Sequence, residues 1–273
     1  MNLPKSLKLP LYFTSVSPVL IVWSYSGFRD YWLFLLLLGV VVFMQAALNL
    51  SMDYFDHLNG RNLRNEDTLF PIGSYLIEKE GADPVRVRIA FVLCAVVSVG
   101  FGTAVIVLTH VYTLLVVGVI ALAVSFMYVL PPFRFNSRGF GEISTFLSFG
   151  PLSTIGSALA FGDHIGFLIS GVSVLLGMLA SAIRYLHHLP EDRQDGTRVR
   201  AFRIVYPLIL LPGFLVTLYR PLAFVFVILP FILAIIHYVL LPRDVIPISR
   251  KTNQIVAIQV LTAVLLTIYF AIY

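Results

Sequence analysis

The sequence predicts an all-α membrane protein that crosses the bilayer as a bundle of about nine transmembrane helices. Of its 273 residues, 59% are hydrophobic and only 12% are charged, whereas soluble domains average about 45–50% and about 25%. Its uncharged runs are also long, since a bilayer core about 30 Å thick needs about 20 apolar residues per helix. This composition excludes intrinsic disorder, and the single cysteine excludes a disulfide-stapled scaffold.

Nine uncharged runs are long enough to cross the bilayer. They cover residues 10–28, 31–51, 87–108, 111–130, 143–161, 165–186, 204–219, 221–241 and 253–272. The stretch LFLLLLGVVVF in the second run is apolar on every side, which favours helices over transmembrane strands, whose residues alternate. The first run lacks the small-residue cleavage site of a signal peptide, so we expect it to be a span. No linker interrupts the series, and residues 1–273 are expected to form a single domain.

The distribution of positive charge predicts the orientation of the protein. Of the 19 Lys and Arg residues, all but Arg29 and Arg220 lie in the N-terminal tail or in loops on the same side of the membrane. Cytoplasmic loops of membrane proteins are enriched in these residues. We therefore expect a multi-pass protein of the cell membrane with its N-terminus in the cytoplasm and its C-terminus on the opposite side. The expected partners include the lipid bilayer and no nucleic acid.

The second run ends in an acidic motif, Asn49-Leu-Ser-Met-Asp53-Tyr-Phe-Asp56. Positions i, i+4 and i+7 of a helix share one face, so Asn49, Asp53 and Asp56 are predicted to point the same way. Carboxylates at the mouth of an apolar span are costly without a compensating cation. His57, one turn after Asp53, could line the same site.

The sixth run ends similarly, in His188-Leu-Pro-Glu191-Asp192-Arg-Gln-Asp195. The spacing of His188, Asp192 and Asp195 copies that of the first motif, and Glu191 and Asp195 form an i, i+4 pair. Both motifs open to the same side of the membrane, because four predicted spans separate them. We expect the two acidic clusters to converge across the bundle.

Facing carboxylate clusters suit a hard divalent cation. Mg²⁺ takes one or two carboxylates and completes its octahedron with phosphate oxygens and water, while arginine and lysine bind the remaining oxygens of a diphosphate. The basic residues in and after the two motifs are Arg61, Arg64, Lys79, Arg193 and Arg198. A magnesium diphosphate site beneath an apolar bundle implies a substrate with a polyanionic head and an apolar tail. In the alternative interpretation, these charges form interfacial salt bridges that only orient loops.

At these residues the sequence resembles the UbiA superfamily of membrane prenyltransferases, which have nine helices and two Asp-rich motifs. The stretch NLSMDYFDHLNG is similar to the Asn-x-x-x-Asp-x-x-Asp form found in the 1,4-dihydroxy-2-naphthoate prenyltransferases. Residues 127–152 resemble a second segment of the quinone-pathway enzymes, with a tyrosine, a Pro-Pro turn, a basic linker, Gly-x-Gly-Glu and Phe-Gly-Pro. Three positions depart from the pattern: Met52 and the pair His187-His188 stand where asparagines are usual, and Glu191 replaces an aspartate.

The resemblance implies a Mg²⁺-dependent enzyme that transfers a polyprenyl group from a polyprenyl diphosphate to an aromatic quinone precursor similar to 1,4-dihydroxy-2-naphthoate. It implies Mg²⁺ ligands at Asp53, Asp56, Glu191, Asp192 and Asp195. It adds substrate-binding roles for Asn49, Arg61, Arg64, Lys79, Arg134, Arg138, His188, Arg193 and Arg198.

Two further residues receive roles from the resemblance. Tyr128 is the expected stabiliser of an allylic cation through its aromatic face. Glu142 is expected either to orient or deprotonate the acceptor or to act as a partner of a helix dipole. Two alternatives to the naphthoate acceptor stay open: a different acceptor, such as a prenylglyceryl phosphate, a hydroxybenzoate or a porphyrin, and a cation-coupled transporter.

Overall fold

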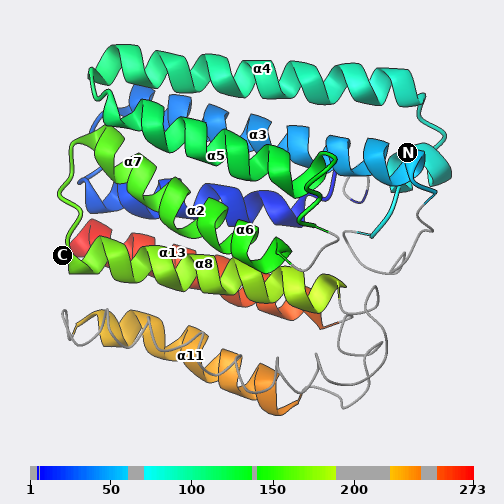
Figure 1. The fold of residues 1–273 in the computed structure, drawn as a ribbon. Helices are drawn as coiled ribbons and strands as arrows, with labels where there is room; N and C mark the ends of the chain where they lie inside the picture. The colour runs from blue at the N-terminus through cyan, green and yellow to red at the C-terminus, as the bar shows by residue number, and fades with distance from the viewer. Residues whose placement is uncertain (1–4, 6, 61–70, 137–139, 189–221, 241–250) are drawn as a thin grey trace.

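The computed structural model describes residues 5, 7–60, 71–136, 140–188, 222–240 and 251–273, and its regular elements are helical (Figure 1). These elements are α2 (Pro10–Tyr25), α3 (Tyr31–Leu58), η1 (Tyr75–Lys79), α4 (Pro84–Thr109), α5 (Thr113–Val129), α6 (Gly141–Leu147), η2 (Ser148–Leu152), α7 (Ser153–Phe161), α8 (Phe167–His188), α11 (Ala223–Val239) and α13 (Thr252–Ile272). The predicted all-α class is therefore confirmed.

Every predicted span except 204–219, which lies outside the described residues, coincides with helical structure. Within the described part of the chain, five helical segments are long and apolar enough to cross a membrane: α3, α4, the continuous series α6, η2 and α7, and then α8 and α13. Helices α5 and α11 are apolar and shorter, with 17 residues each. The chain is thus a multi-pass membrane protein.

Helix α2 lies in the middle of the bundle and packs against α3, α7, α8 and α13. Its buried face carries small side chains, among them Ser15, Ser17 and Ser24. Small residues let helices approach closely in a membrane, where association depends on packing and hydrogen bonds. The start of α2 and the end of α13 lie at opposite ends of the bundle (Figure 1), as expected for an odd number of spans.

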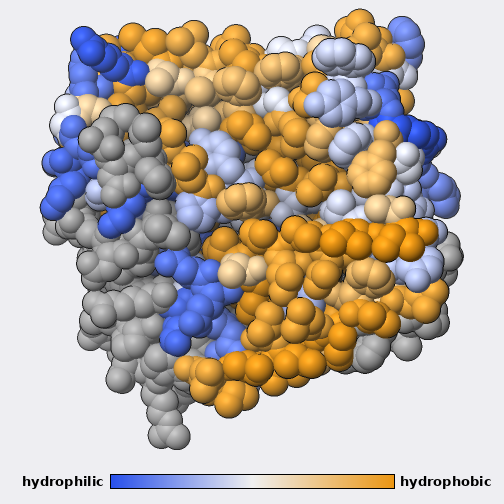
Figure 2. All heavy atoms as spheres, turned by 180° about the vertical axis from the view of Figure 1, so that it is seen from behind, coloured by the Kyte–Doolittle hydropathy of each residue, from blue (hydrophilic) through white to orange (hydrophobic). Residues whose placement is uncertain are grey.

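The outer surface of the bundle is apolar across its middle. Figure 2 shows hydrophobic residues over the central part of the rear face, with hydrophilic residues gathered toward the two ends. Helix α4 is an example, because its large apolar side chains Val92, Leu93 and Val96 are all exposed. In water such a patch would be far larger than a soluble monomer tolerates, so this surface is suited to lipid.

Helix α3 continues through Leu58, beyond the predicted end of its span at residue 51. Its first turn is capped by Asp30, whose Oδ1 accepts a 2.9 Å hydrogen bond from the Leu33 amide. The last two turns carry the first acidic motif, and Asn49, Asp53 and Asp56 are all buried. Their predicted common face is therefore the face that α3 turns toward the rest of the protein.

The helical series from Gly141 to Phe161 is interrupted by a π-helical turn, η2, at Ser148–Leu152. Such turns often mark functional sites, because the extra residue shifts the side chains that follow. Here the turn lies close to α8: a Cβ atom built on Gly150 would be 2.6 Å from the Ser173 carbonyl oxygen and 2.9 Å from the Gly177 Cα. Glycine at both positions allows η2 and α8 to pack backbone to backbone.

Candidate active site

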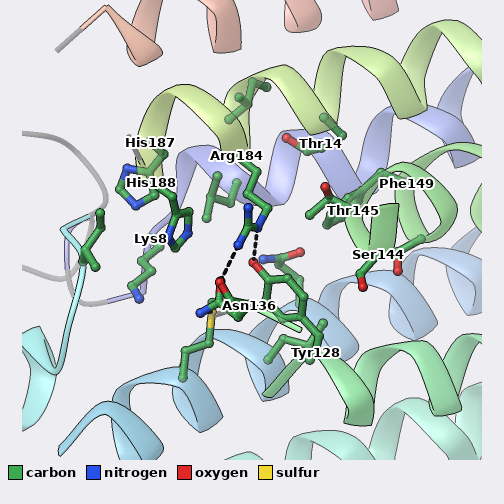
Figure 3. A pocket seen from close by; sticks show the side chains of 18 of the residues that line it. Lys8, Thr14, Tyr128, Asn136, Ser144, Thr145, Phe149, Arg184, His187 and His188 are labelled. Atoms are coloured by element: carbon green, nitrogen blue, oxygen red, sulfur yellow. Dashed lines mark hydrogen bonds between the residues drawn. The ribbon is translucent and has the colours of Figure 1, made fainter. Parts of the chain in front are cut away.

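The ends of α3 and α8 meet at a polar cavity that encloses about 880 Å³ of empty space. It lies at the end of the bundle where α2 begins (Figure 3). Charged and hydrogen-bonding side chains dominate one part of its wall. They are Lys8, Thr14, Gln45, Asp56, Ser125, Tyr128, Asn136, Ser144, Thr145, Ser148, Arg184, His187 and His188.

The three residues of the first acidic motif occupy different places around this cavity. Asp56 lines it. Asp53 lies beside the segment that leads into η1: its Oδ2 accepts a 3.1 Å hydrogen bond from the Leu76 amide. Asn49 is bound to other parts of the protein, because its Nδ2 donates to the Leu7 carbonyl oxygen at 3.0 Å and its Oδ1 accepts from Gln45 Nε2 at 2.9 Å. Asp56 is therefore the acid of the motif that faces the cavity.

The second acidic motif lies outside the described residues, and so do the predicted site residues Glu191, Asp192, Arg193, Asp195, Arg198, Arg61, Arg64 and Arg138. The helix that precedes the motif is described to its end. Its last residues, His187 and His188, line the same cavity as Asp56. Among the described residues, the last turns of α3 and α8 therefore line one cavity.

Lys8 is a cavity residue that the sequence did not single out. It precedes α2, its side chain is 5% exposed, and it lines the cavity beside His188 (Figure 3). The rings of His187 and His188 stand edge to face with centroids 5.1 Å apart. A buried ammonium group is costly unless an anion compensates it, and the charge of Lys8 interacts with the Asp53 carboxylate without forming a direct ion pair among the described residues. A bound anion would supply that compensation.

Arg184 is the second cavity residue that sequence reasoning missed. Its side chain is 7% exposed and bonds to three separate segments. Nε donates to Tyr128 Oη at 3.2 Å, Nη2 donates to the carbonyl oxygen and Oδ1 of Asn136 at 2.6 and 3.1 Å, and Nη1 donates to the Glu142 carboxylate (Figure 3). Nothing in the sequence pairs Arg184 with these residues, because they lie more than forty positions away.

The remaining predicted residues lie around the site or apart from it. Arg134 lines a smaller adjoining hollow together with Asp56 and Tyr128. Lys79 is exposed at the end of η1 and does not line the cavity. His57 does not line it either, since its Nδ1 is paired with the Glu78 carboxylate. Glu142, too, is outside the cavity wall, and Arg184 stands between its carboxylate and the cavity.

The described acids fit part of a Mg²⁺ site. Within the described residues no group of three or more His, Cys, Asp or Glu side chains is placed to hold a metal ion. Asp53 nevertheless keeps one buried carboxylate oxygen, Oδ1, that has no hydrogen-bond partner in the described part of the chain. Together with Asp56 this gives two carboxylates, which is the number that Mg²⁺ takes when substrate phosphates and water complete its shell.

A second, mainly apolar cavity adjoins the polar one. It has about 1270 Å³ of space, partly open to the outside, between α3, α4, α5, η2 and α7. Gln45, Leu48, Ser125, Ser148 and Phe149 line both cavities. The other lining residues are mostly aliphatic, with hydroxyl groups from Ser15, Ser98, Thr103, Ser153 and Ser157. A charged cavity and a mainly apolar one therefore lie side by side.

Comparisons with known proteins agree with this geometry. No family model matches the chain. The chain is 26% identical over 173 residues to a 1,4-dihydroxy-2-naphthoate octaprenyltransferase of Mycobacterium leprae, a match that covers 63% of this chain and 56% of that protein. It is 25% identical over 244 residues to the chloroplastic 2-carboxy-1,4-naphthoquinone phytyltransferase of Arabidopsis thaliana, with 77% of this chain and 60% of that protein covered. The matches thus span less than two thirds of these relatives.

The structural comparison covers more of the chain. The structure of a UbiA homolog from Archaeoglobus fulgidus matches all of this chain and all of that one, with a TM-score of 0.70 and 12% sequence identity. This match shows a common fold, and the sequence matches show distant similarity to named prenyltransferases of naphthoate compounds. The resemblance of the acidic motif and the observed fold agree. The chain thus has the fold of a UbiA homolog and is distantly similar in sequence to prenyltransferases of naphthoate compounds.

Proposed function

We propose that the chain is a Mg²⁺-dependent intramembrane prenyltransferase, which transfers a polyprenyl group from a polyprenyl diphosphate to an aromatic acceptor similar to 1,4-dihydroxy-2-naphthoate. One observation supports this most: the charged cavity and the apolar cavity lie next to each other and share five lining residues. A substrate with an anionic head and a long apolar tail fits two such adjoining cavities, and few other metabolites do.

The donor's diphosphate belongs in the polar cavity. Lys8 supplies a buried positive charge there, and His187 and His188 supply ring nitrogens that can donate hydrogen bonds. Hydrogen bonds from charged donors to phosphate are about twice as strong as neutral ones. Asp53 and Asp56, together with the acids of the second motif, would hold Mg²⁺. Bound Mg²⁺ would neutralise the negative charge that develops on the diphosphate.

Reaction begins with heterolytic cleavage of the bond between the allylic carbon and the diphosphate oxygen. The electron pair leaves with the diphosphate, where the positive side chains stabilise it. The prenyl group becomes an allylic cation, which an aromatic face stabilises. Tyr128 lines the polar cavity and, with Asp56, the smaller hollow beside it, and it supplies such a face. The surrounding apolar wall keeps water from trapping the cation.

An electron-rich ring carbon of the acceptor then forms the new carbon–carbon bond. The ring regains aromaticity by losing a proton or, at a carboxylated carbon, CO2. The named relatives act on naphthoate compounds, which supports a naphthoate acceptor for this chain. The polar wall formed by Ser144, Thr145 and Asn136 offers hydrogen-bond partners for the oxygens of such an acceptor.

A reconstituted assay tests the proposal. The purified protein in lipid vesicles should consume a polyprenyl diphosphate and release diphosphate, and chelation of Mg²⁺ should stop the reaction. Asp56→Asn should abolish most of the activity, because it removes a carboxylate from the cavity. The matched control is Asp163→Asn, since Asp163 lies away from the cavity and its Oδ1 accepts from Arg29 Nη2 at 2.5 Å. Full activity of Asp56→Asn would contradict the proposal.

A panel of acceptors tests the finer assignment. Dihydroxynaphthoate, hydroxybenzoate, prenylglyceryl phosphate and a porphyrin are offered separately with the same donor. We expect the highest kcat/KM with dihydroxynaphthoate. A preference for another member of the panel would overturn the naphthoate assignment and leave the prenyltransferase assignment in place.

A further inference from the structure

The side chain of Arg184 joins the three segments that form one wall of the polar cavity. Tyr128 comes from the end of α5, Asn136 from the loop that follows, and Glu142 from the start of α6, while Arg184 itself lies in the last turns of α8. A guanidinium group is planar and carries five N–H donors in a rigid fork. Two of these segments are also joined to each other, since the Asn136 amide donates to the Tyr128 carbonyl oxygen at 3.0 Å, and Ser181 of α8 donates to the Glu142 carbonyl oxygen at 2.7 Å. Arg184 adds the side-chain contacts that tie all three segments to α8 at the cavity wall.

The charge of Arg184 is balanced within this network. Its side chain is 7% exposed, and it forms an ion pair with Glu142, whose side chain is 24% exposed. A buried arginine with a carboxylate partner is stable, whereas removing one partner of such a pair leaves an uncompensated charge. Because the carboxylate of Glu142 is engaged by Arg184 and lies outside the cavity wall, its role is to compensate and hold the arginine.

Tyr128 is the aromatic member of the network, and it lines the cavity together with Asn136 and Arg184. Its Oη accepts from Arg184 Nε, and the guanidinium carbon lies 5.8 Å from the centroid of its ring. The first contact fixes the hydroxyl end of the side chain, so the ring cannot swing about its χ1 and χ2 torsions. An aromatic ring stabilises a cation only when its face is presented to it. A fixed ring presents that face without reorganisation during the reaction.

We propose that Arg184 is a positioning residue of the reaction, which locks Tyr128 and Asn136 in place, and that Glu142 is its counter-charge and not a proton acceptor. This inference rests on the proposed prenyl transfer. It gives Glu142 a role that neither the helix-dipole interpretation nor the acceptor-deprotonation interpretation includes. It also predicts that Arg184, Glu142 and Tyr128 act as one unit.

The test is a double-mutant cycle in the reconstituted assay. Arg184→Met removes all the donors and keeps an apolar chain of similar reach, and Tyr128→Phe removes only the hydroxyl that accepts from Nε. We expect Arg184→Met to lower kcat by about tenfold or more, which is the order associated with hydrogen bonds from a charged group. The KM for the polyprenyl diphosphate should change little. The double variant should be no slower than Arg184→Met alone, because the two residues act through one contact.

Variants of Glu142 distinguish its two possible roles, as the counter-charge of Arg184 or as a general base. Glu142→Gln keeps an oxygen that accepts from Arg184 Nη1, so we expect it to lose less activity than Arg184→Met and to keep the shape of the wild-type pH profile. A base would behave in the opposite way: its loss would cost more than the loss of Arg184 and would remove one limb of the profile. Arg184→Lys should rescue little, since one ammonium group cannot bridge three segments.

The outcomes distinguish this inference from the proposed function. A wild-type protein that releases no diphosphate overturns both. An active wild type with a fully active Arg184→Met overturns the role of Arg184 alone, as does a double variant whose losses multiply. If Arg184→Met does not fold, as judged by its thermal melting in detergent, Tyr128→Phe tests the contact with the arginine in place: a lower kcat supports it, and full activity overturns it. Gly100→Ala is the control substitution and should leave the activity unchanged, because a Cβ there meets nothing within 4 Å.

Discussion

The guanidinium of Arg184 lies against Gly141, where any side chain would collide with it. A Cβ atom built on Gly141 would be 2.0 Å from Arg184 Cζ and 2.1 Å from its Nη2. Gly141 is also the first residue of α6, the helix that carries Glu142. The absence of a side chain at position 141 is therefore what allows the arginine to reach its partners.

Gly141→Ala should reproduce the effect of removing Arg184 without any change of charge. The added methyl group must displace the guanidinium, which loses its contacts with Tyr128 and Asn136. We expect kcat to fall by about tenfold, as for the loss of a hydrogen bond from a charged donor, and the melting temperature in detergent to fall as well. Steady-state kinetics and thermal melting check this. Wild-type kinetics in Gly141→Ala would show that the close contact between Gly141 and Arg184 does not contribute to activity.

The buried charge of Lys8 leads to a second prediction. Lys8→Met keeps the length and apolar stem of the side chain and removes the ammonium group from the cavity. We expect the KM for the polyprenyl diphosphate to rise by about tenfold, the scale of a charge-assisted contact to phosphate, with a smaller change in kcat. Removal of the ammonium group ends the cost of its burial and also its attraction to the Asp53 carboxylate, so we expect the melting temperature without substrate to change little.

Lys5→Met is the matched control for this prediction, since Lys5 is also a tail residue and does not line the cavity. It should leave the KM unchanged. Equal effects of the two substitutions would indicate a general electrostatic attraction of the tail for the donor. A change confined to kcat in Lys8→Met would contradict diphosphate binding by Lys8.

The fold was largely predictable from the sequence, and the reason is physical. A membrane span requires a continuous apolar run, so each span is encoded locally. The run at 253–272 matches α13 closely, and the run at 31–51 begins where α3 begins, although α3 continues to Leu58. The common face of Asn49, Asp53 and Asp56 was predictable for the same reason, because helical periodicity is a local property.

The site was less predictable because its contacts are not local. Arg184 looked like one more positive residue at a helix end, and its three partners can be recognised only once α5, α6 and α8 are packed. Lys8 looked like a tail residue, yet the packing of α2 against α3 brings it into the cavity wall. His57 and Lys79, by contrast, were predicted near the site from their positions in the sequence. In the structure His57 pairs with Glu78 of η1, and Lys79 at the end of η1 is exposed.

A third prediction concerns the apolar cavity. Gly118 of α5 lines this cavity, and a Cβ there meets nothing within 4 Å. Gly118→Phe would fill space that the prenyl tail is proposed to occupy. We expect the loss of kcat/KM to grow with donor length and to reach about tenfold or more for the longest donors, since even one methylene is worth about 10-fold or more in a tight apolar pocket. Kinetics with donors of increasing length measure this.

The control for this series is Gly118→Ala, which adds one methyl group to open space and should accept all the donors. If Gly118→Phe lowered kcat/KM equally for short and long donors, its effect would be on folding or on the reacting end. The tail would then have to lie elsewhere.

Two glycines at helix crossings give a final prediction, because they differ in what lies opposite them. A Cβ on Gly39 of α3 would be 2.8 Å from ring atoms of Phe101 on α4, whereas a Cβ on Gly177 of α8 would be 2.8 Å from both the ring and the carbonyl oxygen of Phe146. Either alanine substitution should destabilise the protein by roughly 1–3 kcal/mol through overpacking. The two sites should differ in whether a second substitution relieves that cost.

Removing the opposing ring discriminates between the two sites. In Gly39→Ala/Phe101→Ala the ring is gone, so the two losses of stability should be less than additive, with a coupling that thermal or denaturant unfolding detects. In Gly177→Ala/Phe146→Ala the backbone oxygen still blocks the methyl group, so the cost of the alanine should persist. Gly177→Ala should also lower kcat, because it forces the end of α6 away from α8 and so moves the adjoining Ser148 and Phe149, which line both cavities. Full relief of Gly177→Ala by Phe146→Ala would mean that the ring, and not backbone contact between α6 and α8, sets the distance between these elements.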